Sequence, residues 1–166
     1  MKSVPNTTKI TRFNGEPVYY IDGMPTVLRS VHGNVAHGFT VGDDLTTTEC
    51  YVARGQGYYA HGKTAKEAVS SLERKIVSNM NTDDKVKEFV KRFDKDGKYP
   101  VRDFYDWHGT LTGSCTFGRD NFAKEHDIDM EGEMETKEFL RLTKDAFGHE
   151  VIQKVIQEMG LTDEIK

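Results

Sequence analysis

The hydrophobic pattern of this 166-residue chain changes its period at Gly62. Before Gly62, short aromatic and β-branched runs alternate with turn residues such as Asp22-Gly23 and Gly33-Asn34. Turn signals spaced about 8–12 residues apart are typical of an antiparallel meander. After Gly62, apolar residues recur three or four positions apart, as they do along one face of a helix. Strands followed by helices predict an α+β fold.

We expect a meander of about five strands, followed by five to six helices. The strands are predicted at 18–21, 26–31, 35–41, 49–54 and 58–61. The helices are predicted at 65–79, 82–93, 100–107, 115–126, 136–147 and 151–159. We divide the chain into residues 1–80, the meander with its first packing helix, and residues 81–166, a helical region packed on it as one compact unit.

Composition excludes several classes of protein. No apolar run approaches the roughly 20 residues of a membrane helix, and the first residues lack the apolar core of a signal peptide. The net charge of −4 argues against nonspecific nucleic-acid binding, which needs a basic surface. Cys50 and Cys115 stand far apart without a secretory signal, so we expect reduced thiols in a protein of the host-cell cytoplasm.

Cys115 is the first candidate for chemistry. If Ser114 caps the helix predicted from residue 115, the thiol lies in the first turn, where free N–H groups and the helix dipole favour a thiolate. Arg119 lies four residues on and adds positive charge to that face. His108 or His61 would serve as the general base of a nucleophilic cysteine. The alternative is a buried structural cysteine, since cysteine is among the most buried residue types.

The segment His61-Gly62-Lys63-Thr64 is the second candidate. The letters from Gly57 to Thr64 match the pattern of a phosphate-binding loop. Tyr58 to Ala60 reads as a strand, however, so the simpler interpretation is a strand end followed by a helix capped by Thr64. Lys63 and Thr64, together with Ser114 and Arg119, are the candidate binding residues.

The sequence predicts no metal site and no cofactor. The six histidines lack the spacing of a ligand set. Residues 93–103 resemble a calcium loop around Gly97, but that alignment places Arg92 at the first ligand position. A cation at that position favours an ordinary turn between two helices.

Several segments together carry a resemblance to a family. They are residues 21–26, 30–38, 50–53, 60–68, 111–118 and 134–140. The chain resembles an uncharacterised module found in phages and gut bacteria, sometimes at the end of leucine-rich repeat proteins. The resemblance covers most of the chain beyond residue 15, and it implies a phage or mobile-element setting without implying an activity. His61 and Cys115 are its matched polar residues.

The strand, turn and helix from Tyr58 to Ile76 resemble a second family. This segment of about 20 residues is similar to the antitoxin half of HicAB toxin–antitoxin pairs, in which a strand also ends in a Gly-x-Thr-x-x-Glu-Ala pattern. That likeness implies a partner protein as the ligand.

Three functional hypotheses follow. The leading one is a small phage or mobile-element accessory protein that acts by binding, either inhibiting a host defence protein or sequestering its small-molecule signal. The second is a thiol-dependent enzyme that uses Cys115 with a histidine base. The third is an antitoxin-like partner protein.

Overall fold

The computed structural model describes residues 10–166. The chain divides into two compact units, of which the first ends at Lys75 and the second runs from Ile76 to Lys166. The division falls inside helix α1 (Ala65–Ser78). Among the described residues, no helix is long and apolar enough to cross a membrane.

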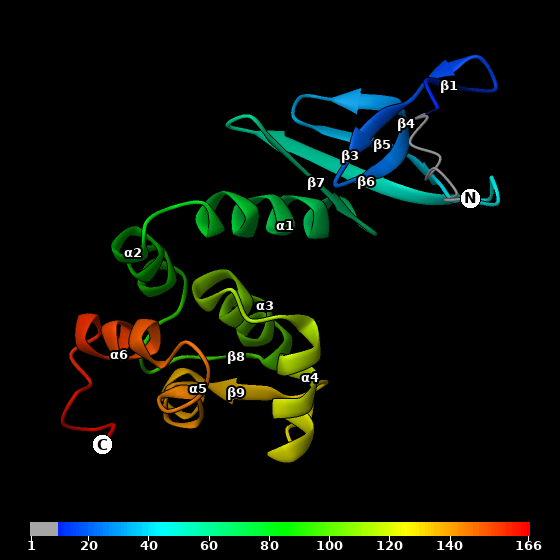
Figure 1. Cartoon of the computed structure of the whole chain (residues 1–166). Helices are drawn as coiled ribbons and strands as arrows, with labels where there is room; N and C mark the ends of the chain where they lie inside the picture. The colour runs from blue at the N-terminus through cyan, green and yellow to red at the C-terminus, as the bar shows by residue number, and fades with distance from the viewer. Residues whose placement is uncertain (1–9) are drawn as a thin grey trace, which may run out of the picture. The chain divides into compact units, whose positions relative to one another are not determined.

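The first unit is built on an antiparallel sheet whose five strands follow one another in sequence order (Figure 1). The strands are β3 (Tyr19–Ile21), β4 (Met24–His32), β5 (Val35–Val41), β6 (Thr47–Gly55) and β7 (Tyr58–Gly62). Each strand pairs with the next, which confirms the predicted meander and the α+β class. A small hairpin precedes the sheet and was not predicted, because its strands β1 (Arg12–Phe13) and β2 (Glu16–Pro17) have two residues each.

Helix α1 approaches strand β7 closely at its start. The Thr64 hydroxyl accepts a hydrogen bond from the Glu67 N–H at 3.1 Å, which confirms the predicted cap. Ala68 is fully buried, and a Cβ at Gly62 would collide with its backbone nitrogen. The glycine therefore permits the helix backbone to touch the strand.

The second unit contains two successive helix–loop–strand–helix halves. The first half consists of α2 (Thr82–Arg92), β8 (Lys98–Pro100) and α3 (Val101–Thr112). The second half consists of α4 (Thr116–Glu125), β9 (Glu133–Glu135) and α5 (Thr136–Thr143), and α6 (His149–Glu158) follows it.

The two halves are joined through their short strands. Strands β8 and β9 pair antiparallel, with Tyr99 opposite Met134. The Val101 N–H donates to the Gly132 carbonyl at 3.0 Å, and the Thr136 N–H donates to the Gly97 carbonyl at 3.1 Å. Because each half offers the equivalent group to the other, the pairing follows an approximate two-fold relation. Neither strand was predicted, since three residues are too few to show alternation.

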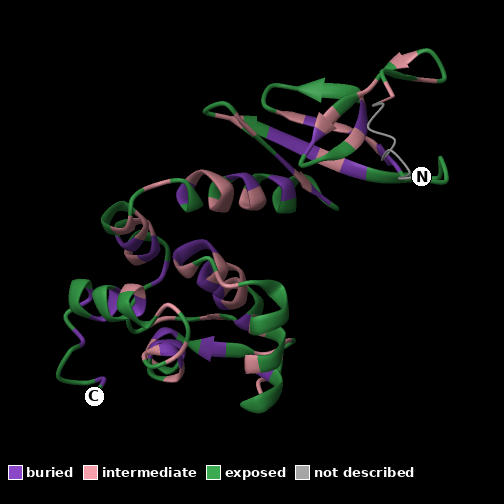
Figure 2. Ribbon diagram, in the orientation of Figure 1, coloured by how far each residue is buried: buried purple, intermediate pink, exposed green. Residues whose placement is uncertain are grey.

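An aromatic cluster fills the core of the second unit. Phe93 stacks on Phe89 and Phe104, with ring centroids 4.5 and 4.8 Å apart, and Phe104 stacks on Phe139 at 4.7 Å. Trp107 meets Phe89 and Phe93 edge to face. Figure 2 shows the buried residues as stripes along the helices of this unit. Such a cluster stabilises a fold through buried area and ring contacts together.

Several helix boundaries differ from the predictions. Helix α3 continues to Thr112, where Gly113 ends it in the left-handed conformation (φ 74°). Helix α5 ends at Thr143 rather than near residue 147. Helix α4 is capped by Cys115 itself, so the expectation that Ser114 is the cap was wrong.

Candidate functional site

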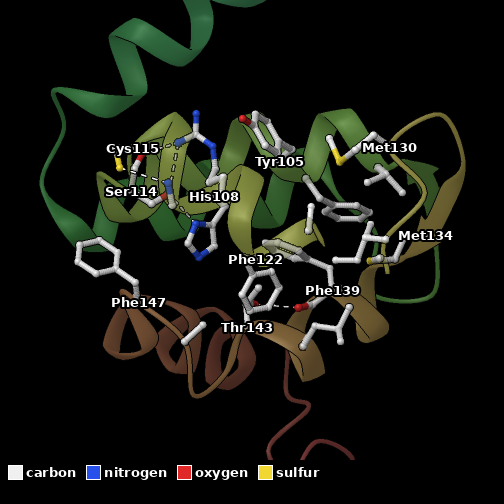
Figure 3. Close-up of a pocket in the computed structure, with 18 of the residues that line it drawn as sticks. Tyr105, His108, Ser114, Cys115, Phe122, Met130, Met134, Phe139, Thr143 and Phe147 are labelled. Atoms are coloured by element: carbon white, nitrogen blue, oxygen red, sulfur yellow. Dashed lines mark hydrogen bonds between the residues drawn. The ribbon is translucent and has the colours of Figure 1, made fainter. Parts of the chain in front are cut away.

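A pocket of about 370 Å³ opens in the second unit, among helices α3, α4 and α5 and the loops that join them (Figure 3). Its volume falls near the lower end of the range for small-molecule sites, about 300–1,000 Å³. Most of the wall is apolar, and polar side chains gather at one end. The lining residues are Val101, Phe104, Tyr105, His108, Gly113, Ser114, Cys115, Gly118, Arg119, Phe122, Ala123, Ile128, Met130, Met134, Phe139, Leu142, Thr143, Ala146 and Phe147.

Hydrogen bonds link three residues at the polar end. The Nη1 atom of Arg119 donates to the Ser114 carbonyl and lies 3.3 Å from the Ser114 hydroxyl. That hydroxyl lies 2.8 Å from Nδ1 of His108. In Figure 3, Ser114, Cys115 and His108 stand on one side of the pocket, whereas Met130 and Met134 stand on the other. The site therefore has a polar end and an apolar body.

His108 is buried at this end, with 8% of its surface exposed. Burial and, to a smaller extent, the positive charge of Arg119 lower the pKa of His108 to about 4. The backbone of Phe147 acts in the opposite direction. The imidazole is therefore neutral at pH 7. Its Nε2 atom is buried and makes no hydrogen bond within the described part of the chain, which is uncommon for a buried polar atom.

Cys115 lines the same pocket and is exposed. Its sulfur accepts a hydrogen bond from the Gly118 N–H at 3.4 Å, as a helix cap does. Among the described residues, no hydrogen bond joins Cys115 to His108, because Nδ1 of the histidine faces Ser114 and Thr112. The structure thus places the predicted nucleophile and one predicted base at one pocket without connecting them.

His61 belongs to the first unit and does not line this pocket. Its Nδ1 atom lies 3.2 Å from the Asp22 carboxylate, and its Nε2 atom lies 3.0 Å from the Thr26 hydroxyl. Burial lowers the pKa of His61. The order carboxylate, imidazole, hydroxyl resembles a hydrolase triad, but Thr26 has no exposed surface from which to attack a substrate. Since Lys75 of α1 also pairs with Asp22, the cluster fastens the β3–β4 turn to the helix.

The other candidates divide between the two units. Lys63 and Thr64 are exposed at the start of α1, where strand β7 leaves no open phosphate loop. Ser114 and Arg119 do lie together, at the polar end of the pocket. Cys50 is buried in the sheet, and burial raises the pKa of its thiol.

Sequence reasoning missed the apolar wall of the pocket. Residues of this wall are contributed by separate segments, and no local pattern marks them as one surface. They include Phe122, Met130, Met134, Phe139 and Phe147.

A second signal was present in the sequence and was overlooked. Residues 127–138 follow the twelve-position pattern of a calcium loop except at position five, where Glu131 replaces Asp or Asn; Gly132 stands at position six and Glu138 at position twelve. The structure nonetheless brings together no group of three histidine, cysteine or acidic side chains able to hold a metal, within the described residues. Arg102 pairs instead with Glu131 of this loop.

Comparisons of the chain with models of protein families, with curated proteins and with solved structures found no match.

Proposed function

We propose that this protein acts by binding, and that the pocket of the second unit holds a small, mainly apolar molecule. One observation carries the proposal: an apolar pocket with a few convergent polar groups at one end, which is the usual form of a small-molecule site. In the phage or mobile-element setting that the sequence resemblance implies, the pocket favours sequestering a small-molecule signal over occupying a host protein.

The polar groups support binding more than catalysis. His108 is neutral at pH 7, and its low pKa makes it a weak base. Its Nδ1 atom faces the hydroxyl of Ser114, and the thiol of Cys115 is used as a helix cap. A protein that binds a small molecule needs a shaped cavity, which the apolar wall supplies.

Binding of a neutral apolar dye, Nile red, tests the proposal. We expect its fluorescence to rise on addition of the purified protein. An Ala123→Leu substitution fills the pocket wall and should abolish the rise, because Ala123 is buried at the pocket. The matched control is Ala65→Leu, at an exposed helical position outside the pocket. A dye signal that both variants retain would reject this pocket as the binding site.

The thiol-dependent enzyme is the second candidate, because Cys115 and His108 line one pocket. Iodoacetamide at about pH 6 distinguishes the two functions, since only a thiolate reacts fast. Rapid labelling of Cys115 in the folded protein favours the enzyme. Labelling at the rate of a free cysteine peptide would reject the enzyme hypothesis.

A further inference from the structure

We infer that the ligand of this pocket is an amphiphile, with an apolar body and an anionic head, of the carboxylate class, held at the Arg119 end. The inference rests on the proposed binding function and adds the chemistry of the ligand. The inference depends on the hydrogen-bond donors, the positive charge and the hydrogen-bond network at the Arg119 end of the pocket.

Arg119 brings a positive charge that pairs with no carboxylate of residues 10–166. Its side chain is half-buried, and it forms no ion pair within the described residues. The nearby Asp120 carboxylate accepts instead the hydroxyl of Tyr105, at 2.6 Å. Buried charges are ordinarily paired, so a half-buried guanidinium without a carboxylate is suited to an anionic ligand.

The guanidinium is also held in place. It lies over the ring of Tyr105, 4.6 Å from the centroid, and Nη1 donates to the Ser114 carbonyl. A Cβ at Gly109 would collide with Nη1, so the glycine lets the guanidinium lie directly against helix α3. Because the group is already fixed, an anion binding to it loses little further side-chain entropy.

The hydrogen bonds around His108 determine which of its nitrogens carries the proton. Thr112 donates its hydroxyl to the His108 carbonyl at 2.7 Å. The Ser114 hydroxyl accepts from Arg119 and therefore has its own proton free for Nδ1, at 2.8 Å. A neutral imidazole that accepts at Nδ1 carries its proton at Nε2. His108 thus presents a donor at Nε2.

Two buried nitrogens at the same end of the pocket make no hydrogen bond of ordinary geometry among the described residues. They are Nε2 of His108 and Nε of Arg119, and the Phe147 backbone also interacts with the His108 ring. Two donors, one of them cationic, are complemented by an acceptor that carries negative charge. The remaining wall, with Phe122, Met130 and Met134, suits an alkyl or aryl body.

A series of ligands with one chain and different heads tests the inference. Titration calorimetry compares decanoate, decanol and decyltrimethylammonium. Since a hydrogen bond to a charged group contributes about 1.5–3 kcal/mol, decanoate should bind at least about tenfold more tightly than decanol. The cation should bind most weakly.

Two variants test whether the difference in affinity between decanoate and decanol comes from the polar end of the pocket. Arg119→Gln should reduce decanoate affinity to that of decanol and leave decanol binding unchanged. Lys124→Gln is the matched control, because Lys124 is exposed on the same helix and the change removes the same charge. Far-UV circular dichroism verifies that each variant is folded.

The outcomes separate the two proposals. Equal affinities for the three heads, no binding of any of the three while Nile red binds, or equal losses in both variants overturn the anionic head and leave the binding function standing. If none of the three compounds binds and Nile red does not bind either, the binding function fails as well. The head-group comparison uses the unmodified protein, so it remains decisive even if Arg119→Gln does not fold.

Discussion

The two helix–loop–strand–helix halves of the second unit share a backbone arrangement and fill it differently. Helix α2 of the first half directs Val86 and Phe89 into the core, where Phe89 is fully buried. Helix α4 of the second half buries only Ala123, and its Phe122 lines the pocket. The leading helix of the first half is thus packed into the core, whereas the leading helix of the second half borders an open cavity.

The loops of the two halves show a second correspondence. Lys137 lies five residues after Gly132 and pairs with Asp96 of the first loop, at 3.0 Å. Arg102 lies five residues after Gly97 and pairs with Glu131 of the second loop. Each loop therefore has one acidic residue paired with a cation of the other half, which joins the halves by charge as well as by strand pairing.

The different burial of Phe89 and Phe122 predicts the largest effect on the free energy of unfolding. Phe89→Ala should lower the free energy of unfolding by about 4 kcal/mol, because it leaves a cavity in a stacked aromatic core. Phe122→Ala should lower it by about 1 kcal/mol, because that ring already borders open space, and should weaken ligand binding instead. Urea denaturation measures both losses. Equal losses would contradict the contrast between a core helix, α2, and a pocket-lining helix, α4.

His108 predicts a somewhat smaller effect, on the pH dependence of stability. The pKa of His108 is about 4 in the folded state, against 6.5 for an ordinary histidine, so the unfolded chain takes up the proton first as the pH falls. The stabilisation is complete above about pH 6.5 and is lost as the pH falls to about 4, by about 3 kcal/mol in total. His108→Asn keeps a polar group near Ser114 and removes the titration.

Urea denaturation between pH 7 and pH 4 measures this loss. The variant should lose less stability on acidification than the unmodified protein does. Parallel pH profiles for the two proteins would show that His108 is not held neutral by its surroundings.

The helix caps predict a still smaller difference between the halves. Asn81 caps α2 and accepts from the Asp84 N–H at 2.9 Å, whereas Cys115 caps α4 through a longer bond to sulfur. Asn81→Ala should therefore destabilise by about 1 kcal/mol, and Cys115→Ala by clearly less. Cys115→Ser should raise the melting temperature slightly, since a hydroxyl is the better cap. A larger loss at Cys115 than at Asn81 would contradict this order.

The sequence predicted those parts of the fold whose signals are local. Alternation and turn residues located β3 to β7, and helical spacing located α1 to α6. The pairing of β8 with β9 was missed, because it depends on contacts between residues such as Tyr99 and Met134, which are distant in sequence. Of the site, Ser114, Cys115, Arg119 and His108 were chosen for their chemistry, whereas the apolar wall depends on tertiary packing. Cys115 rather than Ser114 caps helix α4, because the Ser114 hydroxyl is hydrogen-bonded to His108.

The loop of residues 127–138 leads to the last prediction, that calcium has no effect on the melting temperature. The pattern of residues 127–138 by itself would predict calcium binding. In the structure, Arg102 already neutralises Glu131, and the hydrogen bond from Lys137 lowers the pKa of Asp96. Calcium in residues 127–138 would have to displace Arg102 from Glu131, so millimolar calcium chloride should leave the melting temperature unchanged relative to sodium chloride of equal ionic strength. A saturable rise in the melting temperature would refute this expectation, because a ligand that binds the folded state stabilises it.

The variant Arg102→Gln sharpens the test, because it removes the competing cation from the second loop alone. Any rise in melting temperature confined to that variant identifies Arg102 as the group that excludes the metal.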